Sequence, residues 1–392
     1  MTEEQHFING ILIREIFGMC PDITSQINKI SSNVSFGNNV RIIAQSLDIG
    51  NGVSIGDDVT IEGKQIKIES GSKLGNRLRI NAGEFYMGYC SQIDDDCELG
   101  AIGRPAQEIR FGDNCYFGSS NTALMPILLV GDFVKIHNHT LINGFKPCYI
   151  GHNSWIGQNC VLNCNDVLYV GNNVCIGTYN SIWTHAFWGE LLEGSNVNNV
   201  APTILDDDVW LVGSYNTISP GVTLGKRSMI LTSTVVTKSI TPGKTIAGIP
   251  ARDLTNKLPP FRIVEMPEKI KMMEKFVHEF VEASYPNQYT TIESGLQIKP
   301  KQNEPFKILI KERFSDVDSQ ESEIQLIYVT SNSCKEEYPH ITIFDLSTKT
   351  YTKRRTYPEI QIIKFMNNFR ARFIPQGFER VGQRPEIFVE VS

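Results

Sequence analysis

Residues 204–254 read ILDDDVWLVGSYNTISPGVTLGKRSMILTSTVVTKSITPGKTIAGIPARDL, and a regular repeat runs through them. Aliphatic residues recur at every sixth position, separated by polar or glycine-bearing turns: Ile218, Leu224, Ile230 and Val236. A helix favours a spacing of about 3.6 residues, and a half-buried strand favours strict alternation. A six-residue repeat with one obligatory apolar position predicts instead a parallel β-helix. In that fold each hexapeptide forms one side of a coil and points one aliphatic residue inward.

The same repeat extends toward the N-terminus. Ile49, Ile55 and Ile61 are six residues apart, and glycine directly follows the first two of them. Glycine, Asn and Asp best tolerate the left-handed backbone that a tight corner requires. Later repeats begin 20 residues apart, near Val130, Ile150 and Val170. One turn of the coil therefore contains about three hexapeptides, and we expect on the order of ten turns.

The repeat does not cover the ends of the chain. Within residues 1–32, the stretch 7–17 carries apolar residues at helical spacing, and we expect the segment to be a helical or extended cap over the first turn. The β-helix is expected over residues 33–258, and the repeat stops at the sequence KLPP. Residues 259–392 predict a compact α+β domain whose role the sequence does not indicate. Its expected elements are helices over 267–283 and 358–373, strands over 306–310 and 324–330, and a strand over 341–344 that continues as a hairpin through 351.

Composition excludes several classes of protein. The formal net charge of -6 over 392 residues argues against a general nucleic-acid binder. No apolar run approaches the roughly 18 residues of a membrane span, and the acidic N-terminus lacks the basic region of a signal peptide. None of the nine cysteines forms a CxxC pair, so we expect reduced thiols and no metal site. These features predict a cytoplasmic protein without a membrane span.

One histidine stands beside a long break in the repeat. His185 ends the sequence SIWTH, and residues 186–202 (AFWGELLEGSNVNNVAP) lack the six-residue pattern. A loop that leaves a rigid coil beside a histidine can act as a substrate lid, although an insertion without function is the alternative. The other six histidines have no such context, and each can be a structural imidazole.

Several of these segments resemble a known family in the right order. DDDVWLVGS, ISPGVTLG, STVVTKSI and AGIPARDL are similar to the closing coils of the hexapeptide-repeat acyltransferases, the maltose, galactoside and polysaccharide O-acetyltransferase group. Thr184-His185 stands where that family has its catalytic histidine. The resemblance is specific over residues 180–254, is a bare repeat over 33–180, and is absent after 260. At residues 231–234 this chain has LTST where the family usually has a glycine-alanine-glycine turn. The resemblance also implies that the parallel β-helix is left-handed.

The resemblance implies an O-acyltransferase that takes acetyl-CoA or another acyl-CoA as cosubstrate, with no permanently bound cofactor. His185 is the implied general base, because an imidazole titrates near neutral pH and can accept the proton of a sugar hydroxyl. Backbone N–H groups near Gly213 and Ser214 are the implied donors to the oxyanion. Cations suit the phosphates of CoA. The expected cofactor-binding residues are Gly213, Ser214, Thr232, Ser233, Lys238 and Arg252.

The acceptor is expected to be a sugar or a polysaccharide precursor. Candidate contacts lie in and around the loop that follows His185, with one residue from an earlier turn: Asn180, Trp183, Trp188, Glu190 and His139. Asn180, Glu190 and Glu193 are also candidates to orient the imidazole. A flat coil offers CoA only a shallow surface, so we expect a homotrimer with the active site between subunits.

Three alternatives remain open from the sequence. The first is N-acylation of a nucleotide-linked amino sugar. The second is a zinc-dependent hydratase on the same fold, which needs three converging histidines; His137, His139 and His152 do not match the 20-residue register. The third is a β-helix scaffold without activity. The acidic runs 94–96 and 206–208 favour solvated corners over a metal site or an acceptor contact.

Overall fold

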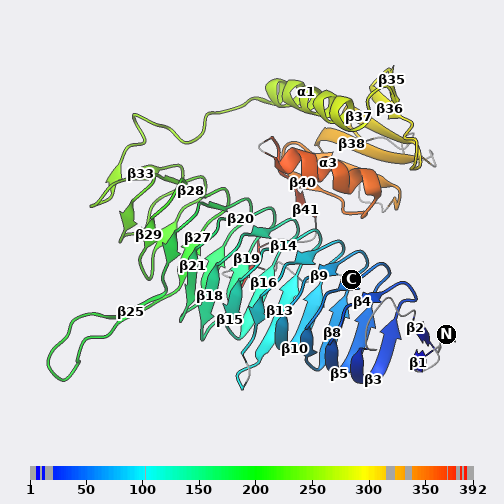
Figure 1. Cartoon of the computed structure of the whole chain (residues 1–392). Helices are drawn as coiled ribbons and strands as arrows, with labels where there is room; N and C mark the ends of the chain where they lie inside the picture. Colours follow the sequence, from blue (N-terminus) through cyan, green and yellow to red (C-terminus); the bar gives the residue numbers. More distant parts are fainter. Residues whose placement is uncertain are drawn as a thin grey trace. The chain divides into compact units, whose positions relative to one another are not determined.

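The structure is a computed structural model that describes residues 6–8, 11–13, 21–101, 103–314, 323–331, 338–368, 370–376, 380–381 and 384–385. The chain divides into two compact units, residues 1–261 and residues 262–392. The first unit is the left-handed parallel β-helix expected from the sequence, and the second unit is an α+β fold (Figure 1).

The β-helix has three faces, named A, B and C in the order in which the chain passes through them. Face A consists of the first halves of β3 (Asp22–Ile30), β5 (Arg41–Ile49) and β10 (Arg79–Met87), with β7 (Thr60–Glu62), β12 (Glu98–Leu99), β15 (Thr122–Leu124), β18 (Leu141–Gly144), β21 (Val161–Cys164), β24 (Ser181–Ile182), β29 (Thr217–Ile218) and β32 (Val235–Val236). Face B consists of the second halves of β3, β5 and β10, with β8 (Gln65–Ile68), β13 (Ala106–Phe111), β16 (Ile127–Val130), β19 (Cys148–Ile150), β22 (Leu168–Val170), β27 (Thr203–Leu205) and β30 (Thr223–Leu224).

Face C is a separate sheet. Its strands are β4 (Ser35–Phe36), β6 (Ser54–Ile55), β9 (Lys73–Leu74), β11 (Gln92–Ile93), β14 (Tyr116–Phe117), β17 (Lys135–Ile136), β20 (Trp155–Ile156), β23 (Cys175–Ile176), β28 (Trp210–Leu211), β31 (Met229–Ile230) and β33 (Thr245–Ala247). A twelfth strand, β34 (Arg252–Asp253), closes the sheet by pairing antiparallel with β33. Eleven parallel strands therefore stack on face C, in agreement with the expected number of turns.

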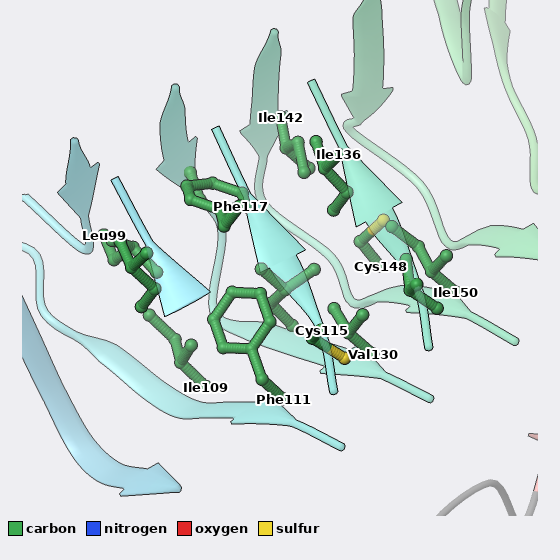
Figure 2. Close-up of a cluster of buried hydrophobic side chains, with 14 of the residues drawn as sticks. Leu99, Ile109, Phe111, Cys115, Phe117, Val130, Ile136, Ile142, Cys148 and Ile150 are labelled. Atoms are coloured by element: carbon green, nitrogen blue, oxygen red, sulfur yellow. The ribbon is translucent and has the colours of Figure 1, made fainter. Parts of the chain in front are cut away.

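The interior follows directly from the six-residue repeat. Ile136, Ile156 and Ile176 are partners in register on face C, and all three are completely buried. Their chain neighbours point outward, so each short strand contributes one residue to the core. Figure 2 shows this core in the middle of the coil, where the rings of Phe111 and Phe117 meet edge to face at 5.4 Å. Burying one aliphatic or aromatic side chain of this size stabilises the fold by about 1.5–3 kcal/mol. Every turn of the coil buries such side chains.

The edges between the faces are tight corners in which backbone groups bond to the next turn. They are called edge AB, edge BC and edge CA after the faces that they join. Asn39, Asp58 and Asn159 lie in corners of edge CA with φ between 55° and 58°, the left-handed region in which Asn and Asp are tolerated. Asn180 lies inside this edge, where its Oδ1 accepts a hydrogen bond of 2.7 Å from the Asn216 N–H of the next turn. Such side chains form hydrogen bonds with the backbone N–H and C=O groups of the corner that water cannot reach.

The coil begins earlier than predicted. Strand β3 (Asp22–Ile30) already pairs in parallel with β5, so faces A and B of the first turn lie within the segment 1–32 that was expected to be a cap. The segment DITSQINKI has its isoleucines four and three residues apart and contains no corner glycine, so it does not show the hexapeptide pattern. Before it, β1 (His6–Ile8) and β2 (Ile11–Ile13) form an antiparallel pair, and residues 14–20 lie outside the described residues.

The second unit contains two helices and a mixed sheet of seven strands. The helices are α1 (Met266–Ser284) and α3 (Tyr357–Asn367). The sheet runs in the order β35 (Tyr289–Ile292), β36 (Gly295–Ile298), β37 (Phe306–Arg313), β38 (Ile324–Ser331), β39 (Ile341–Asp345), β40 (Thr350–Tyr351), β41 (Ile374–Pro375). A further antiparallel pair is formed by β42 (Arg380–Val381) and β43 (Arg384–Pro385).

Most predicted elements of this unit are confirmed, with one correction. The predicted helix over 358–373 is too long, because α3 ends at Asn367 and the N–H groups of Arg370 and Ala371 fold back onto the Met366 carbonyl. Phe373 reaches the core from the segment after the helix and packs edge to face against Phe344 at 5.2 Å. None of the helices in the described part of the chain combines the length and the apolar character that a membrane span requires.

Candidate active site

His185 lies at edge AB, directly after the face A strand β24. It begins β25 (His185–Phe187), which pairs antiparallel with β26 (Asn198–Val200). The segment that breaks the repeat is therefore a β-hairpin, and it projects away from the coil (Figure 1). The imidazole is half-buried at the base of this hairpin, so solvent reaches it. The rigid turns below hold the histidine, and the hairpin extends beyond it.

Asn163 holds the imidazole from the turn below. Its Oδ1 lies 2.8 Å from Nδ1 of His185. The same oxygen accepts hydrogen bonds from the backbone N–H groups of Thr184 and Asn165, both at 3.3 Å. Two backbone donors identify the atom as the amide oxygen, because an NH₂ group cannot accept them. In the neutral imidazole this places the proton of His185 on Nδ1 and leaves the lone pair on Nε2.

Thr184 supports this arrangement from the interior. Its hydroxyl lies 2.8 Å from Asn163 Oδ1 and accepts a hydrogen bond of 2.9 Å from the Asp166 N–H. Thr184 is completely buried and Asn163 is nearly so. Two aromatic rings flank the imidazole, Trp183 edge to face at 5.7 Å and Phe187 at 4.9 Å. The ring is thus fixed in orientation with one nitrogen available for chemistry.

The expected acyl-CoA contacts gather at edge CA. Gly213 has φ 69°, and a Cβ there would lie 2.5 Å from Thr232 Oγ1. The Ser214 N–H donates to Thr232 Oγ1 at 2.9 Å, and this hydroxyl donates to the Ser214 carbonyl at 3.0 Å. Ser233 bonds through its N–H to the same carbonyl. The Ser214 N–H was expected to be an oxyanion donor, but in this chain it is already bonded within the corner.

The two expected cations lie on different edges. Lys238 follows β32 at edge AB, two turns beyond His185, and its side chain is exposed. Arg252 is exposed in β34 and pairs with Ala247 in register, beside edge CA. Within one chain, edge CA therefore brings Gly213 and Arg252 into the same region, and edge AB brings His185 and Lys238 into another.

The predicted acceptor contacts are also separated between edge AB and edge CA. Trp183 contacts His185, and Trp188 is 97% exposed in the hairpin. Glu190 is exposed and accepts a hydrogen bond from the Leu192 N–H. Asn180 cannot contact a substrate, because it is completely buried and bonds the backbone on both sides of its corner.

His139 is exposed in a left-handed corner of edge CA with φ 59°, so a single chain does not bring it to His185. The residue that holds His185 was predicted in the turn or loop of His185 itself, whereas the structure has it in the preceding turn. Asn180, Glu190 and Glu193 were the candidates, whereas Asn163 fills this role. Asn163 precedes Trp183 by 20 residues, about one turn, and this spacing could have placed Asn163 next to the His185 region.

Several of the other acidic residues and histidines considered as site candidates form hydrogen bonds within the corners of the coil. Asp95 and Asp207 each accept a hydrogen bond of 2.8 Å from a corner N–H of the preceding turn. His152 Nδ1 accepts from the Asp132 N–H at 2.9 Å. Burial, and then the charge of Lys135, hold the pKa of His137 below its usual value. Among the described residues, no group of three or more His, Cys, Asp or Glu side chains is arranged to hold a metal ion.

Comparison with known proteins finds similar acetyltransferases. No family model matches the chain. Over 106 residues it is 32% identical to the galactoside O-acetyltransferase of Escherichia coli (strain K12), across 26% of this chain and 51% of that enzyme. The chain resembles the hexapeptide-repeat acyltransferases. It spans about half the length of the curated relatives that it matches.

Solved structures of hexapeptide-repeat acetyltransferases also align with the chain. A maltose O-acetyltransferase from Clostridium difficile 630 is 23% identical, with a TM-score of 0.25, across 34% of this chain and 67% of that one. The polySia-specific acetyltransferase NeuO is 17% identical, with a TM-score of 0.34, across 51% of this chain and 93% of that one.

Proposed function

We propose that the chain is an acyl-CoA-dependent O-acyltransferase that acts on a sugar hydroxyl, with His185 as general base. The observation that supports this most directly is the bond between Nδ1 of His185 and Oδ1 of Asn163. It leaves the lone pair of Nε2 free on a ring that solvent can reach. A fixed, correctly protonated imidazole is what a general base requires.

The reaction follows from this arrangement. Nε2 of His185 removes the proton of the acceptor hydroxyl while the hydroxyl oxygen attacks the carbonyl carbon of the thioester. The C–S bond then breaks, the acyl group stays on the sugar oxygen, and the imidazolium returns its proton to the departing thiolate. Asn163 stabilises the imidazolium through the dipole of its carbonyl, since Oδ1 accepts from Nδ1–H in both protonation states.

The acyl-CoA is proposed to bind along edge CA near Gly213 and Ser214, with Arg252 toward its phosphates. In one chain this edge and His185 are separated by the width of face A. A face A strand of three residues spans about 10 Å at about 3.3 Å per residue. Edge CA of one subunit placed against edge AB of its neighbour brings the two halves of the site together. Three such contacts close a ring, so we propose a homotrimer with the active site between subunits.

The hairpin supports this assembly. Trp188 and Leu192 at its tip are 97% and 94% exposed, and Val197 is 62% exposed. Water-exposed apolar side chains grouped on one projecting segment mark a surface that another molecule covers. A neighbouring subunit with the acceptor between them fits this requirement, and Lys238 would face the same CoA from edge AB.

The test replaces His185 and measures acyl transfer. Purified full-length chain is given acetyl-CoA with matched hydroxy- and amino-sugars, and CoA release is followed. We expect His185→Ala to lose nearly all transfer while its sedimentation and melting temperature stay unchanged. His278→Ala, an exposed histidine of α1, is the control and should keep full activity. Retention of most activity by His185→Ala would overturn the assignment, and consumption of only the amino-sugar would assign N-acylation instead.

A further inference from the structure

A second feature of edge AB lies on the turns that precede His185. Phe145 and Lys146 follow β18 at this edge, two turns before His185, and both are exposed. Arg104 precedes β13 on the same edge and reaches along it. Its Nη2 donates to the Leu124 carbonyl at 3.1 Å, and its guanidinium lies 5.2 Å from the centre of the Phe145 ring. Since neighbouring turns are about 4.8 Å apart, Phe145 stands about 10 Å from His185 along the edge.

The turns between these residues and His185 are continuous. The N–H groups of Phe145 and Lys146 both bond to the Cys164 carbonyl, and the Asp166 N–H bonds to the Thr184 hydroxyl. The edge is therefore one rigid surface from Arg104 to His185. The large ring of Phe145 is 66% exposed on this surface beside the Arg104 guanidinium, so it offers an apolar face to a ligand.

The charges on this surface differ from those in the other corners. Arg77 in edge CA is paired with Asp96 at 2.6 Å, and Arg227 in edge BC is paired with Asp208 at 3.8 Å. Within the described part of the chain, neither Arg104 nor Lys146 lies within ion-pair distance of a carboxylate. Most of the N–H donors of the Arg104 guanidinium are thus available to a ligand. A cation beside an aromatic ring, with free donors, suits an anionic group next to an apolar face.

One carboxylate lies nearer to His185. Asp166 occupies the turn between Lys146 and His185, and its Oδ1 accepts a hydrogen bond of 2.7 Å from the Val167 N–H. An anion placed at that turn would be repelled, whereas a hydroxyl could donate to the carboxylate. The order along the edge is therefore cations, then a hydrogen-bond acceptor, then the Trp183 ring and the base. This order fixes the direction of a bound ligand.

We propose that edge AB from Arg104 to His185 is the acceptor-binding surface and that it selects an acidic saccharide. The inference rests on the proposed function in that the hydroxyl to be acylated lies at His185. A carboxylate or phosphate on a sugar about two turns away binds Arg104 and Lys146. The apolar face of that sugar lies on Phe145, and hydroxyl groups between the two ends donate to Asp166.

The test measures binding in the His185→Ala background, so it needs no turnover. The probes are an oligogalacturonate, its carboxyl-reduced oligogalactose of the same length and linkage, galactose 6-phosphate and galactose. Calorimetric titration of the full-length chain gives the ratio of neutral to acidic Kd for each pair. We expect each acidic probe that binds to do so about three- to tenfold more tightly than its neutral match, the size of one or two exposed charge-assisted contacts.

Variants connect this preference to the named residues. Arg104→Gln and Lys146→Gln should each remove most of the preference, and Phe145→Ala should weaken the acidic and neutral probes equally. Lys73→Gln, an exposed lysine on face C, is the control and should change nothing. A preference for only the carboxylate or only the phosphate supports the inference and identifies the anion.

Two results would overturn the proposal. One is that the unmodified edge binds acidic and neutral probes equally or binds none of the four. The other is that Arg104→Gln and Lys146→Gln change the ratio no more than Lys73→Gln does. The proposed function has a separate test. If His185→Ala keeps its acyl-transfer activity and the charge preference is intact, His185 is not the general base, but the proposed acceptor surface still stands.

Discussion

Replacing Asn163 tests whether the orientation of His185 matters for catalysis. In Asn163→Ala the Nδ1–H of His185 loses its acceptor, so the ring can rotate and can exchange its proton between the two nitrogens. A neutral hydrogen bond contributes about 0.5–1.5 kcal/mol, and about 1.4 kcal/mol corresponds to a tenfold change in population. We therefore expect kcat to fall about two- to tenfold, with a smaller change in the KM for acyl-CoA.

The same substitution affects stability, and the assay must separate the two effects. It leaves the N–H groups of Thr184 and Asn165 without the Asn163 oxygen, which costs about 1–3 kcal/mol for each group that water cannot reach. Rates are therefore measured well below the melting temperature of the variant, with the folded fraction determined by circular dichroism. Thr184→Ser, which keeps the hydroxyl contacts to Asn163, is the control and should retain most of the rate.

A second variant at the same position gives a readout that a purely structural role would not produce. Asn163→Asp still accepts from Nδ1–H, but its carboxylate stabilises the imidazolium. The base would remain protonated to a higher pH, so the acid limb of the kcat/KM profile should move to higher pH. If Asn163→Ala keeps its full kcat and Asn163→Asp leaves the acid limb in place, the orienting role of Asn163 is wrong.

Three further predictions concern the coil, the corner of Gly213 at edge CA and the second unit. Ile176→Ala removes a completely buried core residue and should lower the free energy of unfolding by about 2–5 kcal/mol in a urea titration. Gly213→Ala places a Cβ 2.5 Å from Thr232 Oγ1 and should weaken acetyl-CoA binding in calorimetry, whereas Gly52→Ala, also at φ 69° but in open space, should not. Burial raises the pKa of Glu359 above its usual value, although Thr342 and the N–H groups of Arg354 and Arg355 oppose the shift. The stability that it contributes is therefore present below the unfolded pKa of about 4.5 and is lost as pH rises through the folded value. The stability advantage of the native chain over Glu359→Gln should accordingly decrease from pH 4 to pH 8 in urea unfolding, and an advantage independent of pH would contradict this.

The coil could be predicted because each turn contains its own signal. One aliphatic residue such as Ile156 must enter a narrow interior in every hexapeptide, and each corner needs a residue that adopts a left-handed backbone. In the first turn, the segment of β3 has no corner glycine and no six-residue spacing, and it was missed for that reason. In the second unit, the spacing of Ile362, Met366 and Phe373 continues a helical period beyond the point where the backbone turns away at Asn368.

The candidate site was predicted only in part, because its contacts cross from one turn to the next. His185 was predicted from the family resemblance and from its place before the break in the repeat, and Trp183 from its place beside it. Asn163 is 22 residues from His185 and carries no local signal; only the register of the turns places the two side chains together. Asn180, by contrast, is close to His185 in sequence, but its side chain points into the interior.

Each turn of the coil bonds only to the turn before it and the turn after it, so the body can gain or lose length in whole turns. Removing one complete turn near the N-terminal end, such as residues 60–78, would shorten the molecule by about 4.8 Å and leave every bond around Asn163 and His185 unchanged. The length of the coil and the arrangement of side chains around His185 can therefore vary independently of each other.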